Sequence, residues 1–98
     1  MIAPTPAHRL LDARGRPYFL WDCDVTDEQL RAWLRDPDPV LRSVALGTLM
    51  RQAKPDDVFQ YVGEAAIRRD WVRLQPLLGR TREFWTWLLA TWDRLDAR

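Results

Sequence analysis

The sequence is poor in the residues on which metal centres and nucleophilic sites depend. Its 98 residues include one cysteine, Cys23, and one histidine, His8. One cysteine cannot close an internal disulfide, and this count nearly excludes a zinc site or a Cys–His nucleophile pair. Cys23 also lies between Asp22 and Asp24, whose negative charge disfavours the reactive thiolate. We therefore predict that the chain is not an enzyme, with no catalytic residue, no bound metal and no cofactor.

One alternative for a metal stays open. Carboxylates at Asp22, Asp24 and Asp27 occupy a short stretch and could converge on a hard cation such as magnesium. However, no glycine turn and no later glutamate completes a calcium-loop pattern here. Helix capping and solvation of these acids are therefore favoured over metal binding.

Long apolar runs are absent as well. The longest, residues 84–92, is interrupted by threonines and is far shorter than the roughly 20 residues that cross a membrane. The first eleven residues lack the apolar core of a secretory signal. Together with the single cysteine, these features lead us to expect a cytoplasmic protein that does not enter a membrane.

Asparagine is absent and lysine occurs once, against fourteen arginines, which indicates the codon bias of a GC-rich bacterial genome.

The net charge of +1 gives no general attraction to nucleic acid or membranes. The charges are unevenly placed, however. Residues 21–40 hold six acids against two arginines, and residues 61–80 hold four arginines against two acids. The sequence therefore predicts one acidic and one basic end.

Aromatic residues, in contrast, are abundant, with six tryptophans in a chain that is 47% apolar and 30% charged. That balance is ordinary for one globular domain, and the large rings are expected to dominate its core. Residues 1–17 contain three prolines and a glycine and predict an arm. Tyr18 to Trp21 lack a helical period and predict an extended aromatic segment that docks on the helices. The predicted division is an arm of residues 1–21 and one all-α domain of residues 22–98.

The clearest local signal predicts a helix that begins after Thr26. Thr26 and Gln29 have the spacing of a capping box, and Val25 and Leu30 have that of a hydrophobic staple. The helix must end before Pro37. Its predicted buried face consists of Leu30, Trp33 and Leu34.

Residues 40–53 predict the central helix of the domain, because apolar residues lie almost all round its circumference. Asp36 is its predicted N-cap, and Asp38 and Arg42 have the spacing of an ion pair. The predicted main stripe is Leu41, Ala45, Leu49 and Ala53, with Leu46 and Met50 beside it and Val40 and Val44 on another side.

Three further helices are predicted at residues 55–62, 64–74 and 82–96. Gly63 is expected to end the first in a left-handed conformation, and Thr81 to cap the last. In the last helix the predicted buried stripe is Phe84, Leu88, Trp92 and Leu95, widened by Trp85 and Leu89. Trp87 lies off this stripe and is predicted to be exposed. The sequence therefore predicts about five short helices, packed as a helical bundle or short solenoid.

Residues 36–49, which read Asp-Pro-Asp-Pro-Val-Leu-Arg-Ser-Val-Ala-Leu-Gly-Thr-Leu, resemble the turn and second helix of a HEAT-type repeat. In that family an acidic-proline turn leads into a helix with an apolar residue, Arg, Ala and Leu, here Leu41, Arg42, Ala45 and Leu49. The resemblance covers residues 26–53 and departs from the pattern at Gly47 and Thr48. It implies stacked helical pairs that bind other proteins.

Residues 18–61 also resemble small bacterial antitoxin-like proteins that pair with nucleotidyltransferase toxins. The resemblance rests on Phe19-Leu20-Trp21-Asp22-Cys23-Asp24, on Leu49-Met50-Arg51-Gln52-Ala53 and on Asp56-Asp57-Val58-Phe59-Gln60-Tyr61. It implies a cognate protein partner that this domain binds and inhibits.

Two functions follow as alternatives. The first is a non-catalytic protein–protein interaction module that binds another protein or a second copy of itself. Its predicted partner-binding residues are Trp87, Arg94, Tyr18 and Trp21, although Trp87 could instead lie on the arm of its own chain. The second, less favoured, is a nucleic-acid-binding helical domain. Its predicted contacts are Arg68, Arg69, Arg73, Arg80 and Arg82.

Overall fold

The computed structural model describes residues 4–20 and 24–96. These residues form seven α-helices and three 3-10 helices with no β-strand, which confirms the predicted all-α class. None of these helices is long and apolar enough to cross a membrane. In chain order the elements are α1 (Ala7–Leu10), η1 (Tyr18–Leu20), α2 (Asp27–Leu34), α3 (Pro39–Gln52), α4 (Pro55–Val58), α5 (Glu64–Arg69), α6 (Trp71–Leu74), η2 (Gln75–Leu77), η3 (Gly79–Thr81) and α7 (Arg82–Asp96).

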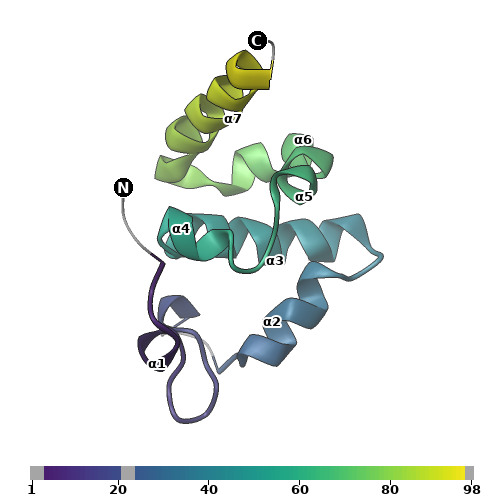
Figure 1. Cartoon of the computed structure of the whole chain (residues 1–98). Coiled ribbons are helices and arrows are strands. Elements are labelled where there is room, and N and C mark those ends of the chain that lie inside the picture. Colours follow the sequence, from purple (N-terminus) through teal and green to yellow (C-terminus); the bar gives the residue numbers. More distant parts are fainter. Residues whose placement is uncertain (1–3, 21–23, 97–98) are drawn as a thin grey trace.

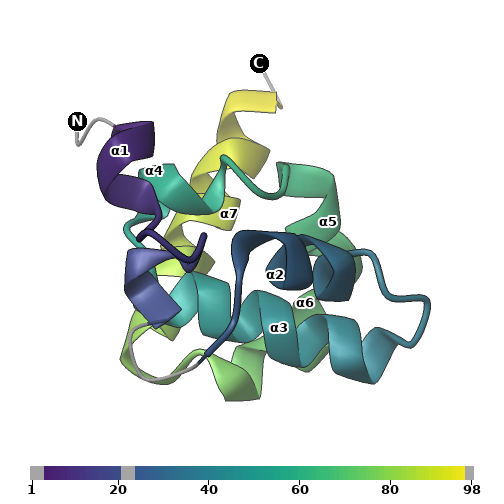
Figure 2. The same ribbon diagram turned by 90° about the horizontal axis from the view of Figure 1, so that it is seen from below.

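Helix α3 lies at the centre of the molecule. It contacts α2, α4, α6 and all three 3-10 helices. In Figure 1 it crosses the middle of the molecule, with α7 and α5–α6 on one side and α1 and α2 on the other. Figure 2 shows α2 lying along one end of α3 and η1 beside the other. The buried residues of α3 are Ser43, Ala45, Leu46, Gly47, Leu49 and Met50.

One side of α3 is open, contrary to the sequence prediction. Val40, Leu41 and Val44 are 60%, 56% and 53% exposed. Leu41 was predicted on the buried stripe and is therefore corrected. The physical reason is that α2 has eight residues against fourteen in α3 and runs away from α3 (Figure 1), so it covers only part of the longer helix.

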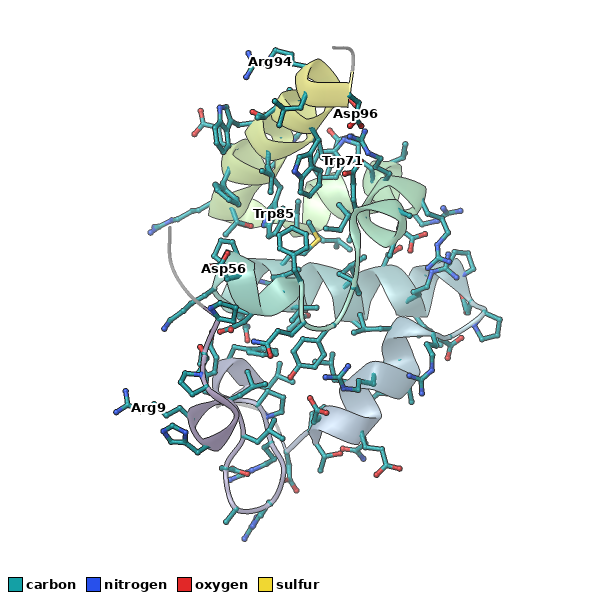
Figure 3. The ribbon with its side chains drawn as sticks, viewed as in Figure 1. Arg9, Asp56, Trp71, Trp85, Arg94 and Asp96 are labelled. Atoms are coloured by element: carbon teal, nitrogen blue, oxygen red, sulfur yellow. The ribbon has the colours of Figure 1, made fainter. Side chains whose placement is uncertain are left out.

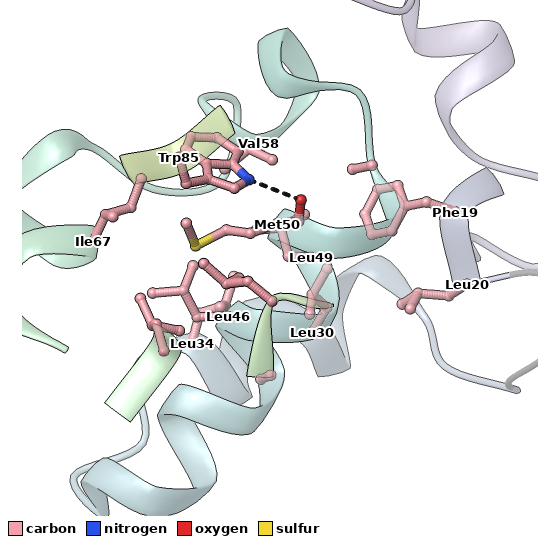
Figure 4. Close-up of a cluster of buried hydrophobic side chains, with 14 of the residues drawn as sticks. Phe19, Leu20, Leu30, Leu34, Leu46, Leu49, Met50, Val58, Ile67 and Trp85 are labelled. Carbon is pink, nitrogen blue, oxygen red and sulfur yellow. Dashed lines mark hydrogen bonds between the residues drawn. The ribbon is translucent and has the colours of Figure 1, made fainter. Parts of the chain in front are cut away.

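The core joins α3 to α7 and to the N-terminal segment. Figure 4 shows the Trp85 indole among the aliphatic side chains that surround α3. Its Nε1 donates a hydrogen bond of 3.1 Å to the Met50 carbonyl, so the ring is both packed and oriented. Of the tryptophans that the structure describes, Trp85 alone is fully buried, at 1% exposed. Aliphatic residues therefore supply more of the core than the tryptophan count predicted.

The caps of α2 and α3 are set by local residues. Thr26 Oγ1 accepts the Gln29 backbone N–H at 3.2 Å, and Gln29 Oε1 accepts the Thr26 N–H at 2.9 Å, which confirms the capping box. The predicted cap of α3 was wrong by two residues. Asp38, not Asp36, accepts the Val40 N–H at 2.9 Å, because Pro39 occupies the first helical position.

The bounds and caps of several helices also differ from prediction. The helix expected over residues 55–62 is the shorter α4, which ends at Val58. The helix expected over residues 64–74 is divided into α5 and α6 at Asp70, whose backbone leaves the helical range. Gly63 has φ −103°, so it precedes α5 in an ordinary extended conformation and is not a left-handed cap. Thr81 donates its hydroxyl to the Leu78 carbonyl at 2.7 Å, where the sequence predicted an accepting cap.

The N-terminal segment folds back onto α3 and α4. Leu10, Phe19 and Leu20 are buried in the common core. The aromatic segment predicted as extended is instead the 3-10 helix η1, in which the Leu20 N–H donates to the Pro17 carbonyl at 3.1 Å. Proline favours this turn because its ring fixes φ near the helical value. Trp21 lies outside the described residues.

Helix α7 buries a different edge from the one predicted. Trp85 and Leu89 are buried, whereas Phe84 and Leu95 are 38% and 57% exposed. Leu88 and Trp92 are half-buried against the core, with the Trp92 ring centroid 5.6 Å from that of Phe59. The end of α7 extends beyond the rest of the molecule (Figure 1), which leaves Leu95 accessible. Trp87 is 56% exposed, as predicted.

Gly47 lets the η2 turn approach α3 closely. A Cβ atom at this position would lie 3.1 Å from Leu77 Cβ, an atom fixed to the backbone. We expect Gly47→Val to lower the free energy of unfolding by about 1–3 kcal/mol through overpacking. Ala65→Val, an insertion of similar size at an exposed position of α5, is the control, with an expected loss of about 0.5 kcal/mol or less. Equal losses in urea unfolding would contradict the close contact.

Candidate interaction site

A hollow with a largely apolar lining lies between α2 and α3. Its volume is about 350 Å³. Its two polar linings are Asp36 and Thr48, and the Thr48 hydroxyl already donates to the Val44 carbonyl at 3.0 Å. We call this hollow the α2–α3 groove. Its lining residues are Leu20, Val25, Leu30, Trp33, Asp36, Leu41, Val44, Ala45 and Thr48.

The sequence builds this groove from residue size. Leu41, Val44, Ala45 and Thr48 are each three or four positions from two of the others, so they share the face of α3 that lines the hollow, and Ala45 and Thr48 are the smaller ones. At the other wall, the staple residue Val25 packs against the core at the start of α2.

The rim of the groove is apolar and accessible. Trp33 is 46% exposed, although the sequence predicted it to be buried with Leu30 and Leu34. Leu41 and Val44 also line the hollow and are more than half exposed, so three accessible apolar side chains border it. Exposed apolar side chains gathered at one hollow are typical of sites where another molecule binds.

Two of the predicted partner-binding residues lie on another part of the molecule. Trp87 and Arg94 share a face of α7, joined through Thr91, whose hydroxyl donates to the Trp87 carbonyl at 2.9 Å and accepts Arg94 Nη2 at 3.2 Å. Arg94 is near the free end of α7 (Figure 3). The structure therefore brings Trp87 and Arg94 together but places them away from the α2–α3 groove.

Tyr18, the third predicted partner residue, is tied into its own chain. Its hydroxyl donates to Asp57 Oδ2 at 2.6 Å and accepts the Lys54 N–H at 3.0 Å. Asp57 also accepts the Thr5 N–H at 2.7 Å, the Thr5 hydroxyl at 2.6 Å and the Gln60 amide at 2.9 Å. We call this network the Asp57 clasp. It fastens the N-terminal segment to α4, and the fourth predicted residue, Trp21, lies outside the described residues.

The hydrogen bonds and burial of the Asp57 clasp shift the pKa values of Tyr18 and Asp57. Burial and the Asp57 carboxylate raise the pKa of the Tyr18 hydroxyl. Burial acts to raise the pKa of Asp57 also, but the hydrogen bonds from Thr5, Tyr18 and Gln60 outweigh it and hold that pKa below its ordinary value. The carboxylate is therefore saturated with donors and serves as a structural acceptor.

A second buried carboxylate, Asp70, holds the start of α3. Arg42 Nε and Nη2 each donate to it at 2.8 Å, and Arg42 Nη1 donates to the Asp36 carbonyl at 3.1 Å. The predicted Asp38–Arg42 pair is thus replaced, because Asp38 caps α3 and Arg42 turns inward. The Arg42 hydrogen bonds hold the pKa of Asp70 below its ordinary value.

The predicted basic patch is divided in the structure. Arg68 binds Glu64 at 2.6 Å and Asp93 at 2.9 Å, and Arg69 lies 3.8 Å from Asp70, so carboxylates offset both charges. Arg73 is exposed. The ring nearest these arginines in sequence, Trp71, is half-buried against the core (Figure 3).

Arg80 and Arg82, in contrast, share an open depression of about 600 Å³ with the exposed Trp87. Glu83 and Thr86 also line it, and Arg82 donates to Gln75 at 3.2 Å. The sequence placed Trp87 with the protein-binding residues and the two arginines with the nucleic-acid contacts. Folding brings the three side chains to one surface.

Within the described ranges, no group of three or more His, Cys, Asp or Glu side chains could hold a metal ion. Asp22 lies outside those ranges, so the alternative of a magnesium site at Asp22, Asp24 and Asp27 stays a prediction. His8 is exposed on α1, a helix of four residues.

The α2–α3 groove was not predicted as a site. A signal was present, since apolar residues occupy almost the whole circumference of α3, more than its short neighbours can cover. Comparison with known proteins adds no relative to this structural description. No protein-family model matches the chain, and neither a curated protein nor a solved structure matches it.

Proposed function

We propose that this chain is a non-catalytic protein-interaction module that holds a segment of a partner protein in the α2–α3 groove. The observation that carries the proposal is the apolar hollow with Trp33, Leu41 and Val44 exposed around it. Burying those side chains against a partner removes apolar surface from water, which is the main favourable term in association. Tryptophan is also among the residues enriched at binding hot spots.

A macromolecule accounts for this surface better than a small molecule does. A volume of about 350 Å³ lies at the low end of the range for small-molecule sites. A ligand confined to the hollow would leave the outer faces of Val40, Leu41 and Val44 in water. A protein segment can fill the hollow and cover its rim together.

The family resemblances refine this proposal. A HEAT-like arrangement around residues 26–53 would make the α2–α3 pair a unit for binding other proteins. The antitoxin-like resemblance would make the partner a nucleotidyltransferase toxin in a bacterial cytoplasm. Both refinements are part of the proposal, and the identity of the captured partner tests them.

The test compares two exposed valines, one at the groove and one away from it. Val44→Lys places a charge at the rim of the groove, and Val72→Lys places the same charge on α6, where valine is 81% exposed. A tagged chain is co-expressed with the untagged products of its neighbouring genes, and co-purifying proteins are identified by mass spectrometry. We expect one partner to be retained by the wild type and Val72→Lys and lost from Val44→Lys. Retention by both variants, or recovery of a homo-oligomer only, would overturn the proposal.

Both valine substitutions should leave the fold intact. Each residue is more than half exposed, so we expect the free energy of unfolding to change by about 0.5 kcal/mol or less for either variant. Urea unfolding checks this expectation. A loss above about 2 kcal/mol for Val44→Lys alone would show that Val44 belongs to the core, because surface substitutions do not have effects of that size.

A second candidate function rests on a separate observation. Arg80, Arg82 and Trp87 share one open depression, a combination of cations and a stacking ring that suits single-stranded nucleic acid. For this function we expect a gel-shift assay to detect binding at low salt that weakens steeply as salt rises. A double Arg80→Ala and Arg82→Ala variant should lose this binding. Absence of any shift at low salt removes the second candidate.

A further inference from the structure

Resting on the proposed function, we infer that the segment held in the α2–α3 groove is an amphipathic helix with basic residues at the edges of its apolar face. The partner class follows from three properties of the site. These are the form of its walls, the sign of the surrounding charge and the composition of the chain's own exposed helix.

The walls of the groove favour a helix. Both are helices, and a third helix can pack its side-chain ridges between those of the first two. The eight residues of α2 extend over about 12 Å, which corresponds to roughly two helical turns of a partner. Apolar residues at positions i, i+3, i+4 and i+7 cover such a length. The described residues contain no strand, so they offer no sheet edge to which an extended peptide could pair.

The charge around the groove is negative. Residues 24–38 carry five carboxylates against two guanidiniums, a net charge of −3. Asp36 is the charged member of the described lining, and its Oδ1 accepts the Asp38 N–H at 2.8 Å. Arg31 is engaged with Asp27 at 2.8 Å and lies over the Tyr61 ring.

The carboxylates of Asp36 and Asp38 lie at the turn into α3, at one end of the groove. Asp24, next to the lining residue Val25, is bound by Arg16 at 3.4 Å, so Arg16 offsets its charge. Lysine or arginine flanking the apolar face of a partner would therefore meet the opposite charge at the end formed by the turn into α3. Complementary charge of this kind selects among partners and speeds their encounter.

A second copy of this chain does not supply the required helix. Its exposed amphipathic helix is α7, which has Phe84, Trp87 and Leu95 on its accessible surface. However, α7 carries three carboxylates and two arginines, a net charge of −1. The sign is wrong for the acidic surroundings of the groove, so the geometry points to a different protein.

The experiment uses two synthetic helical peptides of about 14 residues, roughly four turns, with the same leucine face. One has lysine and the other glutamate on its polar face. Fluorescence anisotropy measures the Kd of each for the wild type, Val44→Lys, Val72→Lys and Asp36→Asn. The asparagine variant keeps an oxygen for the Asp38 N–H and removes the charge.

We expect the Kd of the lysine peptide for the wild type to be about tenfold or more below that of the glutamate peptide. The difference between the two Kd values should shrink as salt rises. Val44→Lys should weaken the lysine peptide about tenfold, and Val72→Lys should leave it unchanged. Asp36→Asn should weaken the lysine peptide selectively, by about two- to fivefold.

Each other outcome overturns the inference in a recognisable way. Equal binding of both peptides that is lost in Val44→Lys would remove the charge preference and leave the groove as the docking site. Binding unaffected by Val44→Lys would remove the groove as well. Failure of both peptides to bind would reject a basic helix as the occupant, while partner capture separately decides the proposed function. A dimer in light scattering that Val44→Lys dissociates would assign the groove to a second copy.

Discussion

Trp85→Ala should lower the free energy of unfolding by about 3–5 kcal/mol, the largest effect expected from one substitution in this chain. The indole is 1% exposed and packs from α7 against α3. Its removal leaves a cavity and also leaves the Met50 carbonyl without its hydrogen bond from Nε1. A domain of this size has a total stability of about 5–15 kcal/mol, so the variant should be close to unfolding at 37 °C. Urea unfolding measures the change.

Trp87→Ala is the matched control, since it removes the same side chain two positions along the same helix. Trp87 is 56% exposed, so we expect a loss of about 0.5 kcal/mol or less. Trp85→Phe keeps most of the packing and removes the hydrogen bond, and should fall between the two. Similar losses for Trp85→Ala and Trp87→Ala would contradict the burial that the structure gives.

Asp57→Ala should have the second largest effect, a loss of about 2–4 kcal/mol. The substitution removes the acceptor of the Asp57 clasp and leaves the Thr5 and Tyr18 donors without it. Because the clasp fastens the N-terminal segment to α4, backbone amides of residues 4–20 should also exchange faster with deuterium. Asp96→Ala, at an exposed acid at the end of α7, is the control. Unchanged exchange in residues 4–20 would show that the clasp does not hold this segment.

The buried carboxylates also predict how stability depends on pH. The pKa values of Asp57 and Asp70 are lowered from 3.8 in the folded chain by hydrogen bonds from their partners. A depressed folded-state pKa stabilises the fold fully above the unfolded value, and this contribution is lost as pH falls through the folded value. Unfolding free energy should therefore fall below about pH 3.8, and less steeply in Asp57→Asn and Asp70→Asn than in the wild type. If the unfolding free energy falls with pH at the same slope in all three proteins, the lowered pKa values of Asp57 and Asp70 are contradicted.

The helix bounds that sequence could predict are those with strong local signals. The capping box at Thr26 and Gln29 placed the start of α2 correctly, and the predicted helix of residues 82–96 coincides with α7. These signals act between residues three or four positions apart, so no knowledge of the tertiary fold is needed. The all-α class follows from their sum.

Burial was harder to predict than helix position. The period of apolar residues shows which side chains share a face, but a face is buried only if another element covers it. Trp33 and Leu41 share faces with buried residues and are nevertheless exposed, because α2 and α3 leave a groove between them. Phe84 and Leu95 on α7 are exposed for the same general reason, because no other element fully covers their side of the helix.

Long-range polar contacts could not be predicted from spacing. Asp38 and Arg42 have the separation of a helical ion pair, yet Arg42 binds Asp70, 28 positions away. The clasp joins Thr5 to Asp57 across 52 positions. In each case a buried carboxylate is satisfied by a donor that only the tertiary fold brings near.

The candidate site shows the same limit. Sequence reasoning favoured Trp87, Arg94, Tyr18 and Trp21 because large aromatic and arginine side chains are enriched at interfaces. The α2–α3 groove depends instead on which residues of two helices remain uncovered, and that is settled by packing. The roles of Trp87 and Arg94 in partner binding stay predictions.

The most direct test of the central claim is a methyl NMR titration of the leucine- and valine-labelled chain with the captured partner. If the partner lies in the α2–α3 groove, the resonances of Leu20, Val25, Leu41 and Val44 will shift or broaden, and that of Val72 will not. Changes confined to Leu88 and Leu95 on α7, with the groove methyl groups unaffected, would contradict the account.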